Sequence, residues 1–231
     1  MSYLLVHGAF RGGWAWGEVP RLLRERGNDV LAPSLLGMGE LAPPPKDRGI
    51  VTLDDWRRQL AGLAELEELS EVVAVGHSQG GLAVRSAADA LGDRLAAIAY
   101  LDAPIARAGQ RGVDLSGPKA PGQLPPRDMW IEAVPLGPDS GLDETQLAWV
   151  NERLGPTPVA PSLDPVEGPE PTVPTHVAFC TGTPEGFPST VTRATMDVAQ
   201  QPYELFDAPH DVAVAAPVAV ATWLERIRPG R

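Results

Sequence analysis

The chain alternates between short apolar runs and longer amphipathic stretches. The apolar runs have the length of β-strands and cover residues 3–7, 29–35, 71–75, 95–101, 175–180 and 203–207. The run at 95–101 is apolar throughout, as expected of a parallel strand that is buried on both faces. The spacing of amphipathic helices is found at residues 19–27, 52–69 and 217–227. This alternation predicts an α/β fold in which helices cover both faces of a mostly parallel sheet.

One region departs from the alternation. Between Pro104 and Pro174 the chain is crowded with proline and glycine, and its only helical patterns are short, near residues 129–133 and along residues 143–155. The roughly 50 residues that follow are too few to form a domain with its own core, and they supply strands that complete the first sheet. We therefore predict a single domain over residues 1–231, with an insertion at about 104–174. This insertion would form a lid over the carboxyl edge of the sheet, where open α/β sheets bind ligands.

The strongest chemical signal is VAVGHSQGGLAV, residues 73–84. It reads as a buried strand, a turn of small residues and a helix, with Ser78 between Gly76 and Gly80. A Gly-x-Ser-x-Gly turn in this context is typical of a nucleophile elbow, in which a sharp bend lifts the serine hydroxyl above the sheet. The alternative is a glycine-rich loop that carries an incidental serine. The flanking strand and helix favour the elbow, so we predict Ser78 as a nucleophile.

Two other segments offer the remaining parts that a serine nucleophile needs. HGAF, residues 7–10, follows the first strand and can direct the backbone N–H of Ala9 at a developing oxyanion. The backbone N–H of Gln79 would be the second donor of this oxyanion hole. His210 lies between the last strand and the last helix, where a loop histidine can reach Ser78 as a general base.

The other three histidines have different expected roles. His7 directly precedes the glycine of the HGAF turn, and we expect it to brace that turn. His77 sits on the elbow, but its spacing points it away from the nucleophile. His176 opens a strand and is expected to be a core or surface residue. Only His210 is predicted as the base.

The composition and net charge of the chain limit the kinds of partner that it is expected to bind. The net charge of −11 argues against nucleic acids and anionic membranes, which reward clustered Lys and Arg. The single cysteine, Cys180, excludes an internal disulfide and a cysteine-only metal site, and we expect it to be a small core residue. No stretch approaches the roughly 20 apolar residues of a membrane span, and the first ten residues lack the basic start of a signal peptide. We expect a cytoplasmic protein that acts on a small molecule without metal or cofactor.

Together these motifs resemble α/β-hydrolases of the EstC-like and plant methylesterase/hydroxynitrile lyase group. The resemblance rests on residues 4–39, 73–84, 99–104, 147–166, 176–182 and 210–217. It implies the α/β-hydrolase fold, hydrolysis of esters with small or aromatic acyl groups, no metal and often a homodimer. Several members of the group are not hydrolases, so the resemblance defines the fold more firmly than the reaction.

Two departures from the group concern the chemistry. Hydroxynitrile lyases of the group carry threonine at the position of Gly8 and lysine at the position of Asp211. An aspartate would repel the cyanide leaving group that the lysine attracts, so lyase activity is not expected. The group also places its triad acid where this chain has Thr183, and threonine cannot ionise.

The acid must then come from elsewhere at the carboxyl edge of the sheet. Asp102 ends the strand that follows the nucleophile helix, Glu185 lies two residues beyond Thr183, and Asp211 adjoins His210 itself. An aspartate at a rigid strand end holds an imidazole better than a glutamate in a Gly/Pro-flanked loop. We therefore favour Asp102 over Glu185, with Asp211 as the weakest candidate.

The sequence thus predicts a serine hydrolase of an ester or thioester with a small, aromatic or polyketide-type substrate. One alternative is a carbon–carbon bond hydrolase or cyclase-like tailoring enzyme that acts on a β-dicarbonyl compound. A second is a non-catalytic small-molecule binding protein on the same fold. The substrate-lining residues are predicted to be Phe10 and, from the insertion, Met129, Trp130 and Trp149.

Overall fold

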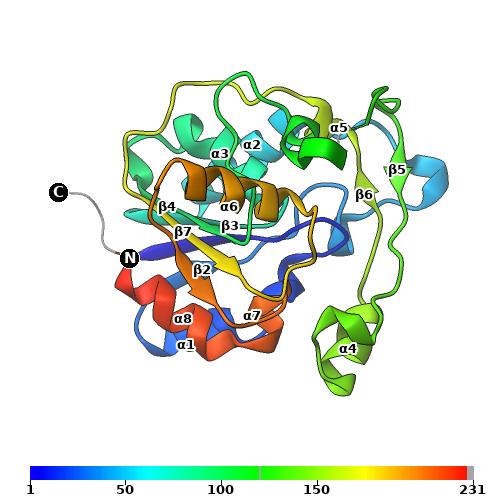
Figure 1. Ribbon diagram of the computed structural model, residues 1–231. Coiled ribbons are helices and arrows are strands. Elements are labelled where there is room, and N and C mark those ends of the chain that lie inside the picture. The colour runs from blue at the N-terminus through cyan, green and yellow to red at the C-terminus, as the bar shows by residue number, and fades with distance from the viewer. Residues whose placement is uncertain (120, 228–231) are drawn as a thin grey trace.

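A six-stranded, fully parallel sheet lies at the centre of the protein (Figure 1). The computed structural model describes residues 1–119 and 121–227. In spatial order the strands are β2 (Asp29–Leu31), β1 (Ser2–Val6), β3 (Val72–His77), β4 (Leu95–Leu101), β7 (Thr175–Cys180) and β8 (Glu204–Phe206). The predicted α/β fold class, with its mostly parallel sheet flanked by helices, is confirmed. The order places β3 beside β4, so the ends of these two strands, at Ser78 and Asp102, come close together.

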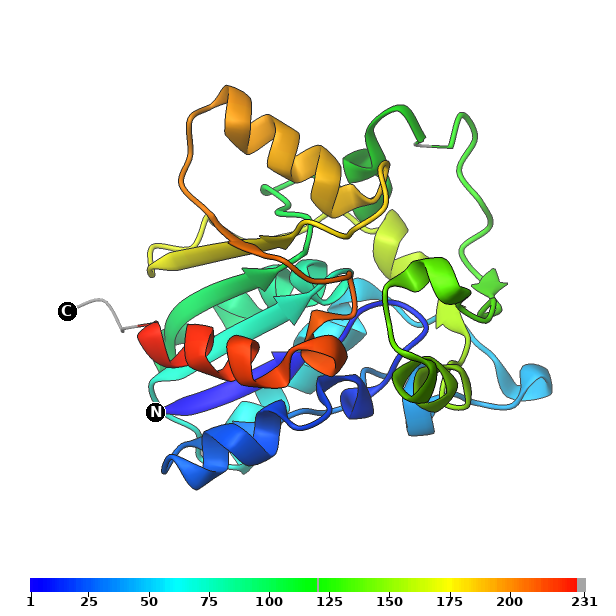
Figure 2. The ribbon, with the colours of Figure 1, turned by 60° about the horizontal axis from the view of Figure 1, so that its bottom comes forward.

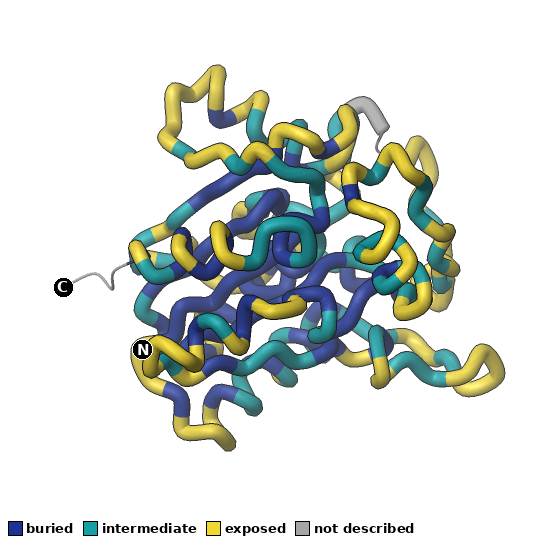
Figure 3. Tube along the Cα trace, turned by 90° about the horizontal axis from the view of Figure 1, so that it is seen from below, coloured by how far each residue is buried: buried dark blue, intermediate teal, exposed yellow. Residues whose placement is uncertain are grey.

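Helices cover both faces of the sheet, and each face has its own apolar core. On one face lie α1 (Val19–Glu25), α7 (Val212–Ala215) and α8 (Pro217–Arg226), and on the other α2 (Leu53–Leu66), α3 (Gly80–Leu91) and α6 (Pro188–Val198). Along β1, Tyr3 and Leu5 belong to the first core, whereas Leu4 and Val6 belong to the second. The inner strands β1, β3 and β4 are apolar at nearly all successive positions because both of their faces are buried (Figure 3).

Several helix and strand boundaries differ from the ends of the apolar runs, because local hydrogen bonds and loop contacts determine where an element begins or ends. Helix α2 begins at a capping box, in which the Thr52 hydroxyl accepts from the Asp55 N–H and the Asp55 carboxylate accepts from the Thr52 N–H. The second predicted strand, 29–35, is paired only over Asp29–Leu31, because residues 32–38 leave the sheet to form a loop beside the HGAF turn. Helix α6 was not predicted, since it buries only Ser189 and Met196 and is rich in Ser, Thr and Val, which are weak helix formers.

The insertion, residues 104–174, connects β4 to β7 at the end of the sheet toward which the strands point (Figure 2). It contains α4 (Glu144–Asn151), α5 (Ala160–Leu163) and a two-stranded antiparallel sheet of β5 (Trp130–Ile131) and β6 (Thr157–Pro158). Helix α4 agrees with the pattern at 143–155. The helical prediction for 129–133 is wrong: so short a segment cannot sustain a helix by itself, and its backbone pairs with β6 instead.

No helix within residues 1–119 and 121–227 is both long enough and apolar enough to cross a membrane.

Candidate active site

Ser78 occupies a strained turn between β3 and α3. Its φ angle is +51°, a conformation that non-glycine residues rarely adopt. A Cβ atom at Gly80 would lie 2.3 Å from the carbonyl oxygen of Val6, and one at Gly76 would lie 2.6 Å from that of Gly80. Only glycine therefore allows the chain to turn this tightly. The turn places Ser78 at the N-terminus of α3, where the helix dipole favours negative charge.

Asp102 lies directly after β4 and is paired with His210. Its side chain is only 1% exposed, its φ angle is +45°, and its Oδ2 atom lies 2.5 Å from Nδ1 of His210. The loop after β7 holds the same carboxylate: the Thr183 hydroxyl donates to Oδ2, and the Cys180 N–H donates to Oδ1 over 3.3 Å. Burial opposes ionisation of Asp102, but the hydrogen bond and charge of His210, with help from Thr183, keep the pKa of Asp102 below its ordinary value.

This pairing determines which nitrogen of His210 is available for chemistry. A carboxylate can only accept, so Nδ1 of His210 carries the hydrogen and Nε2 is left with a lone pair. The ring packs edge-on against Phe187, with centroids 4.9 Å apart, and lies 4.7 Å from the ring of His77. The structure thus brings together Asp102 and His210 from the predicted site. Glu185, by contrast, is exposed on the loop after β7.

His7 orients the peptide unit that carries the N–H of Ala9. The Leu35 N–H donates to Nε2 of His7 over 3.0 Å, so the ring hydrogen lies on Nδ1, which donates to the Gly8 carbonyl over 2.8 Å. In a trans peptide the C=O and the N–H point in opposite directions, so fixing the Gly8 carbonyl also fixes the N–H of Ala9. Burial lowers the pKa of His7 to about 4, which preserves this neutral tautomer.

His77 and Cys180 are fully buried neighbours of the site. His77 Nε2 lies 2.8 Å from the backbone carbonyl of His210 and donates to it. This hydrogen bond holds the loop that carries His210 against the turn that carries Ser78. Burial and the nearby His210 lower the pKa of His77 to about 3. Burial also raises the pKa of the Cys180 thiol, which lies in the core as expected. His176 opens β7, and burial lowers its pKa as well.

A buried ion pair, which was not predicted from the sequence, joins the segment of the HGAF turn to the loop that carries His210. Nε and Nη2 of Arg11 each donate to one Asp211 oxygen over 2.6 Å, and Nη1 donates to the Ala9 carbonyl over 2.9 Å. Both side chains are less than one-tenth exposed. Burial opposes ionisation of Asp211, but Arg11 outweighs it and keeps the pKa of Asp211 below the usual range. The pair accounts for Asp211, which therefore faces Arg11 and not His210.

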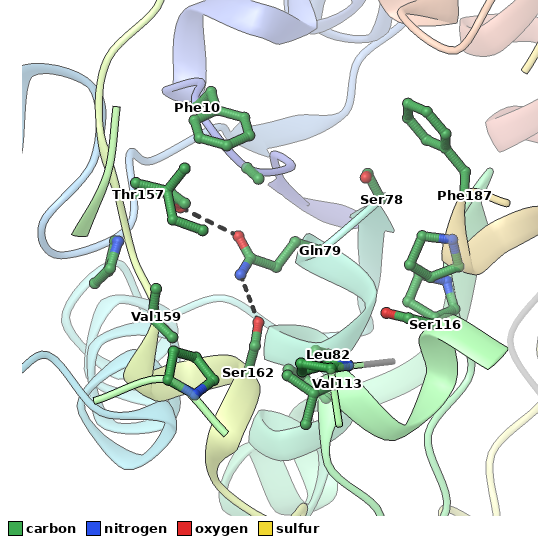
Figure 4. Close-up of a pocket in the computed structure, with 18 of the residues that line it drawn as sticks. Phe10, Ser78, Gln79, Leu82, Val113, Ser116, Thr157, Val159, Ser162 and Phe187 are labelled. Carbon is green, nitrogen blue, oxygen red and sulfur yellow. Dashed lines mark hydrogen bonds between the residues drawn. The ribbon is translucent and has the colours of Figure 1, made fainter. Parts of the chain in front are cut away.

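A cavity of about 470 Å³ opens beside Ser78. The predicted residues Ala9, Phe10, Ser78 and Gln79 line it (Figure 4). The insertion contributes most of the opposite wall, including Val113, Ser116, Ile131, Thr157, Val159 and Ser162. None of the described residues that line the cavity carries a charge, and most are apolar. Such a cavity suits an uncharged ligand of small-molecule size.

The three large side chains predicted from the insertion lie elsewhere. Trp130 donates from Nε1 to the Gly49 carbonyl over 3.1 Å and stacks beneath the guanidinium of Arg48. Trp149 packs edge-on against Trp14, with ring centroids 5.4 Å apart. Met129 directly precedes β5 and is 43% exposed. These three residues do not appear among those lining the cavity: Trp130 and Trp149 contact segments outside the insertion, and Met129 is exposed. Ile131, two positions after Met129, lines the cavity instead.

The insertion also forms hydrogen bonds with both segments that are predicted to supply the oxyanion hole. The Gly155 N–H donates to the Phe10 carbonyl over 3.0 Å, and the φ angle of Phe10 is +65°. On the other segment, the Gln79 side-chain amide donates to the Ser162 hydroxyl over 2.9 Å (Figure 4). Phe10, Ser78 and Asp102 all have positive φ angles, and such strain is often concentrated at functional sites.

As for metals, the described residues contain no group of three or more His, Cys, Asp or Glu side chains that could hold an ion.

Comparison with known proteins agrees with this architecture. Residues 3–223 match the profile of the alpha/beta hydrolase family. The chain belongs to the alpha/beta hydrolase family. The predicted resemblance to the esterase, methylesterase and hydroxynitrile lyase group is thereby confirmed.

This chain has relatives among both curated proteins and solved structures. It is 38% identical over 125 residues to a carbendazim hydrolyzing esterase of Nocardioides sp. (strain SG-4G), covering 54% of this chain and 49% of that protein. It is 32% identical over 102 residues to an alpha-hydroxynitrile lyase of Arabidopsis thaliana, covering 44% and 39%. The matches thus span half or less of these relatives. A polyneuridine aldehyde esterase mutant shares the fold with a TM-score of 0.78 and 18% identity, over 97% of this chain and 98% of that one.

Proposed function

We propose that the protein is a serine hydrolase that cleaves uncharged esters through the triad Ser78, His210 and Asp102. The observation that carries the proposal is the 2.5 Å contact between Asp102 and Nδ1 of His210, whose ring packs against Phe187. Phe187 and the strained Ser78 both line the cavity. The esterase relatives and the family support an ester hydrolase over a binding protein.

In the first half-reaction, Ser78 Oγ attacks the ester carbonyl carbon while Nε2 of His210 takes the hydroxyl proton. The carbonyl π electrons move onto oxygen, and the backbone N–H groups of Ala9 and Gln79 stabilise the resulting oxyanion. Asp102 stabilises the imidazolium that forms. When the tetrahedral intermediate collapses, His210 returns the proton to the departing alkoxide, and the acyl group remains on Ser78.

In the second half-reaction a water molecule takes the place of the alcohol. His210 removes its proton as the water oxygen attacks the acyl carbon, and the same N–H groups stabilise the second oxyanion. Collapse releases the carboxylic acid and returns the proton to Ser78. Each residue thus ends the cycle in its initial protonation state.

Labelling with a fluorophosphonate, followed by a panel of neutral nitrophenyl esters, tests the proposal. We expect stoichiometric labelling of Ser78, and a loss on the order of 10⁴-fold in ester turnover in Ser78→Ala. Retention of more than a tenth of the activity by Ser78→Ala would refute the mechanism. A protein that neither labels nor turns over any ester would instead be a binding protein on this fold.

The same panel should include a bulky aromatic β-diketone and a polyketide-type ester. Carbon–carbon bond hydrolysis would use the same nucleophile and oxyanion hole, so only the substrate distinguishes it from ester hydrolysis. We expect the esters to be consumed faster than the diketone. The reverse order would assign the carbon–carbon reaction.

A further inference from the structure

The wall of the cavity beside Ser78 is mainly apolar but contains a polar strip; the hydroxyls of Ser116 and Ser189, which also line the cavity, do not belong to it. The strip consists of Thr157, Gln79 and Ser162, and Figure 4 shows the Gln79 amide between the other two side chains. Neighbouring wall residues such as Leu82, Val113 and Val159 are apolar. A polar group that lines an apolar cavity is costly unless it finds a partner, so the strip needs an explanation.

The hydrogen bonds of the strip leave capacity on the Gln79 amide. A glutamine amide offers two N–H donors and an oxygen that accepts two bonds. Donation to Ser162 over 2.9 Å uses one N–H group. The Thr157 hydroxyl approaches Oε1 only to 3.4 Å, well beyond the usual 2.5–3.0 Å of an O–H···O bond, so Oε1 keeps most of its ability to accept.

The Ser162 hydroxyl adds a second group with spare capacity. Its oxygen accepts from Gln79, and a hydroxyl can also donate its own hydrogen. Oε1 of Gln79 and the Ser162 hydroxyl thus form an acceptor beside a donor. Together they match a ligand group that both donates and accepts, namely a hydroxyl or an amide-type N–H with its carbonyl.

We propose that the strip is a specificity subsite for a second, uncharged hydrogen-bonding group on the substrate, a hydroxyl or an amide-type group. The inference rests on the proposed ester hydrolysis and specifies its substrate class: a neutral, mainly apolar ester with one further polar group. Charged substituents are disfavoured, since none of the described cavity residues could neutralise them.

Matched pairs of neutral esters test the subsite. Methyl phenylacetate is compared with the ortho, meta and para isomers of methyl hydroxyphenylacetate, which place the hydroxyl on the acyl side. Phenyl acetate is compared with the three hydroxyphenyl acetates, which place it on the alcohol side. We expect at least one isomer to exceed its parent about tenfold in kcat/KM, because one good hydrogen bond contributes about that factor.

The variants locate the preference. We expect Gln79→Leu to bring the hydroxyl-to-parent ratio close to one and Ser162→Ala to lower it at least threefold. Ser116→Ala is the matched control, because Ser116 lines the same cavity outside the strip and its loss should leave the ratio unchanged. If Gln79→Leu does not fold, Ser162→Ala decides the question.

The outcomes separate this inference from the proposed function. Ser78-dependent hydrolysis of the parent esters without preference for any hydroxyl isomer would overturn the subsite and leave the hydrolase intact. A preference that survives in both strip variants, or that disappears in Ser116→Ala, would also overturn it. Absence of hydrolysis of every parent ester would refute the proposed function, and the subsite with it.

Discussion

Replacing Asp102 by asparagine should disable the site through the tautomer of His210. The three donors that now converge on the carboxylate belong to His210, Thr183 and Cys180. If the asparagine oxygen keeps the Cys180 N–H, its NH₂ group takes the place of Oδ2 and donates to Nδ1 of His210. The ring hydrogen then moves to Nε2, which can no longer accept the proton of Ser78.

The expected loss in kcat is about 10⁴-fold, as in serine proteases with the same substitution, or roughly 5 kcal/mol of transition-state stabilisation. Asparagine has nearly the same shape as aspartate, and the Thr183 hydroxyl can rotate to accept from it, so the fold should be retained by circular dichroism. Turnover of a neutral nitrophenyl ester and the rate of fluorophosphonate labelling measure the effect.

Two further variants make this prediction specific. Glu185→Gln, which removes the other candidate acid, should change kcat less than threefold. Adding Thr183→Asp to Asp102→Asn should recover at least tenfold, because residue 183 already contacts the carboxylate that faces His210. The reasoning fails if Asp102→Asn keeps a tenth of wild-type kcat, or if Glu185→Gln is the more damaging change.

Three other predictions follow from contacts in and around the site. A Cβ atom at Gly8 would lie 2.7 Å from Cβ of Ser78, so Gly8→Ala should displace the HGAF turn, which is proposed to supply one oxyanion-hole donor, and lower kcat about 10²-fold with little change in KM; wild-type kcat would contradict this. The folded state holds His7 and His77 neutral, with pKa values of about 4 and 3 against 6.5 when unfolded. Above about pH 6.5 both histidines are neutral in the folded and the unfolded states, and the free energy of unfolding is at its full value. As the pH falls toward 4, only the unfolded state takes up the two protons, so the free energy of unfolding decreases by about 3 kcal/mol per pH unit for both protons together. Denaturant titrations between pH 7.5 and 4.5 measure this slope, and a flat profile would refute the assignment. Trp130→Ala should lower Tm by several degrees without altering the order of preference among acyl groups, and a changed order with unchanged Tm would place Trp130 in the cavity after all.

The fold was largely predictable because it depends on burial. Strands such as β3 and β4 are buried on both faces, so their sequences are apolar at successive positions and can be recognised without any partner. Helix α6 escaped detection because it contacts the sheet at few positions, and β5 because its two residues depend on pairing with β6. Elements that draw their stability from distant contacts leave little local pattern.

The candidate site shows the same division. Ser78 and the HGAF turn are encoded by short contiguous motifs whose steric demands are local, so they could be named from the sequence; their catalytic roles stay predictions. The Arg11–Asp211 pair joins residues 200 positions apart, and no local signal relates them. Met129, Trp130 and Trp149 are absent from the residues that line the cavity. Their size and apolarity favour burial but do not specify against which surface.

The position of Asp102 at the end of β4 has a consequence for how this hydrolase can change over evolution. The charged partner of His210 is anchored on a central strand, next to the strand that carries Ser78. The loop after β7 contributes a hydroxyl from Thr183 but no charge, and a few residues later Phe187 reaches the cavity wall. Residues 184–187 can therefore lengthen, shorten or exchange side chains, and so reshape the cavity, without displacing the carboxylate. In the proposed mechanism, residues 184–187 contribute to substrate preference while the carboxylate of the triad is anchored on β4, so this loop can vary while Asp102 is conserved.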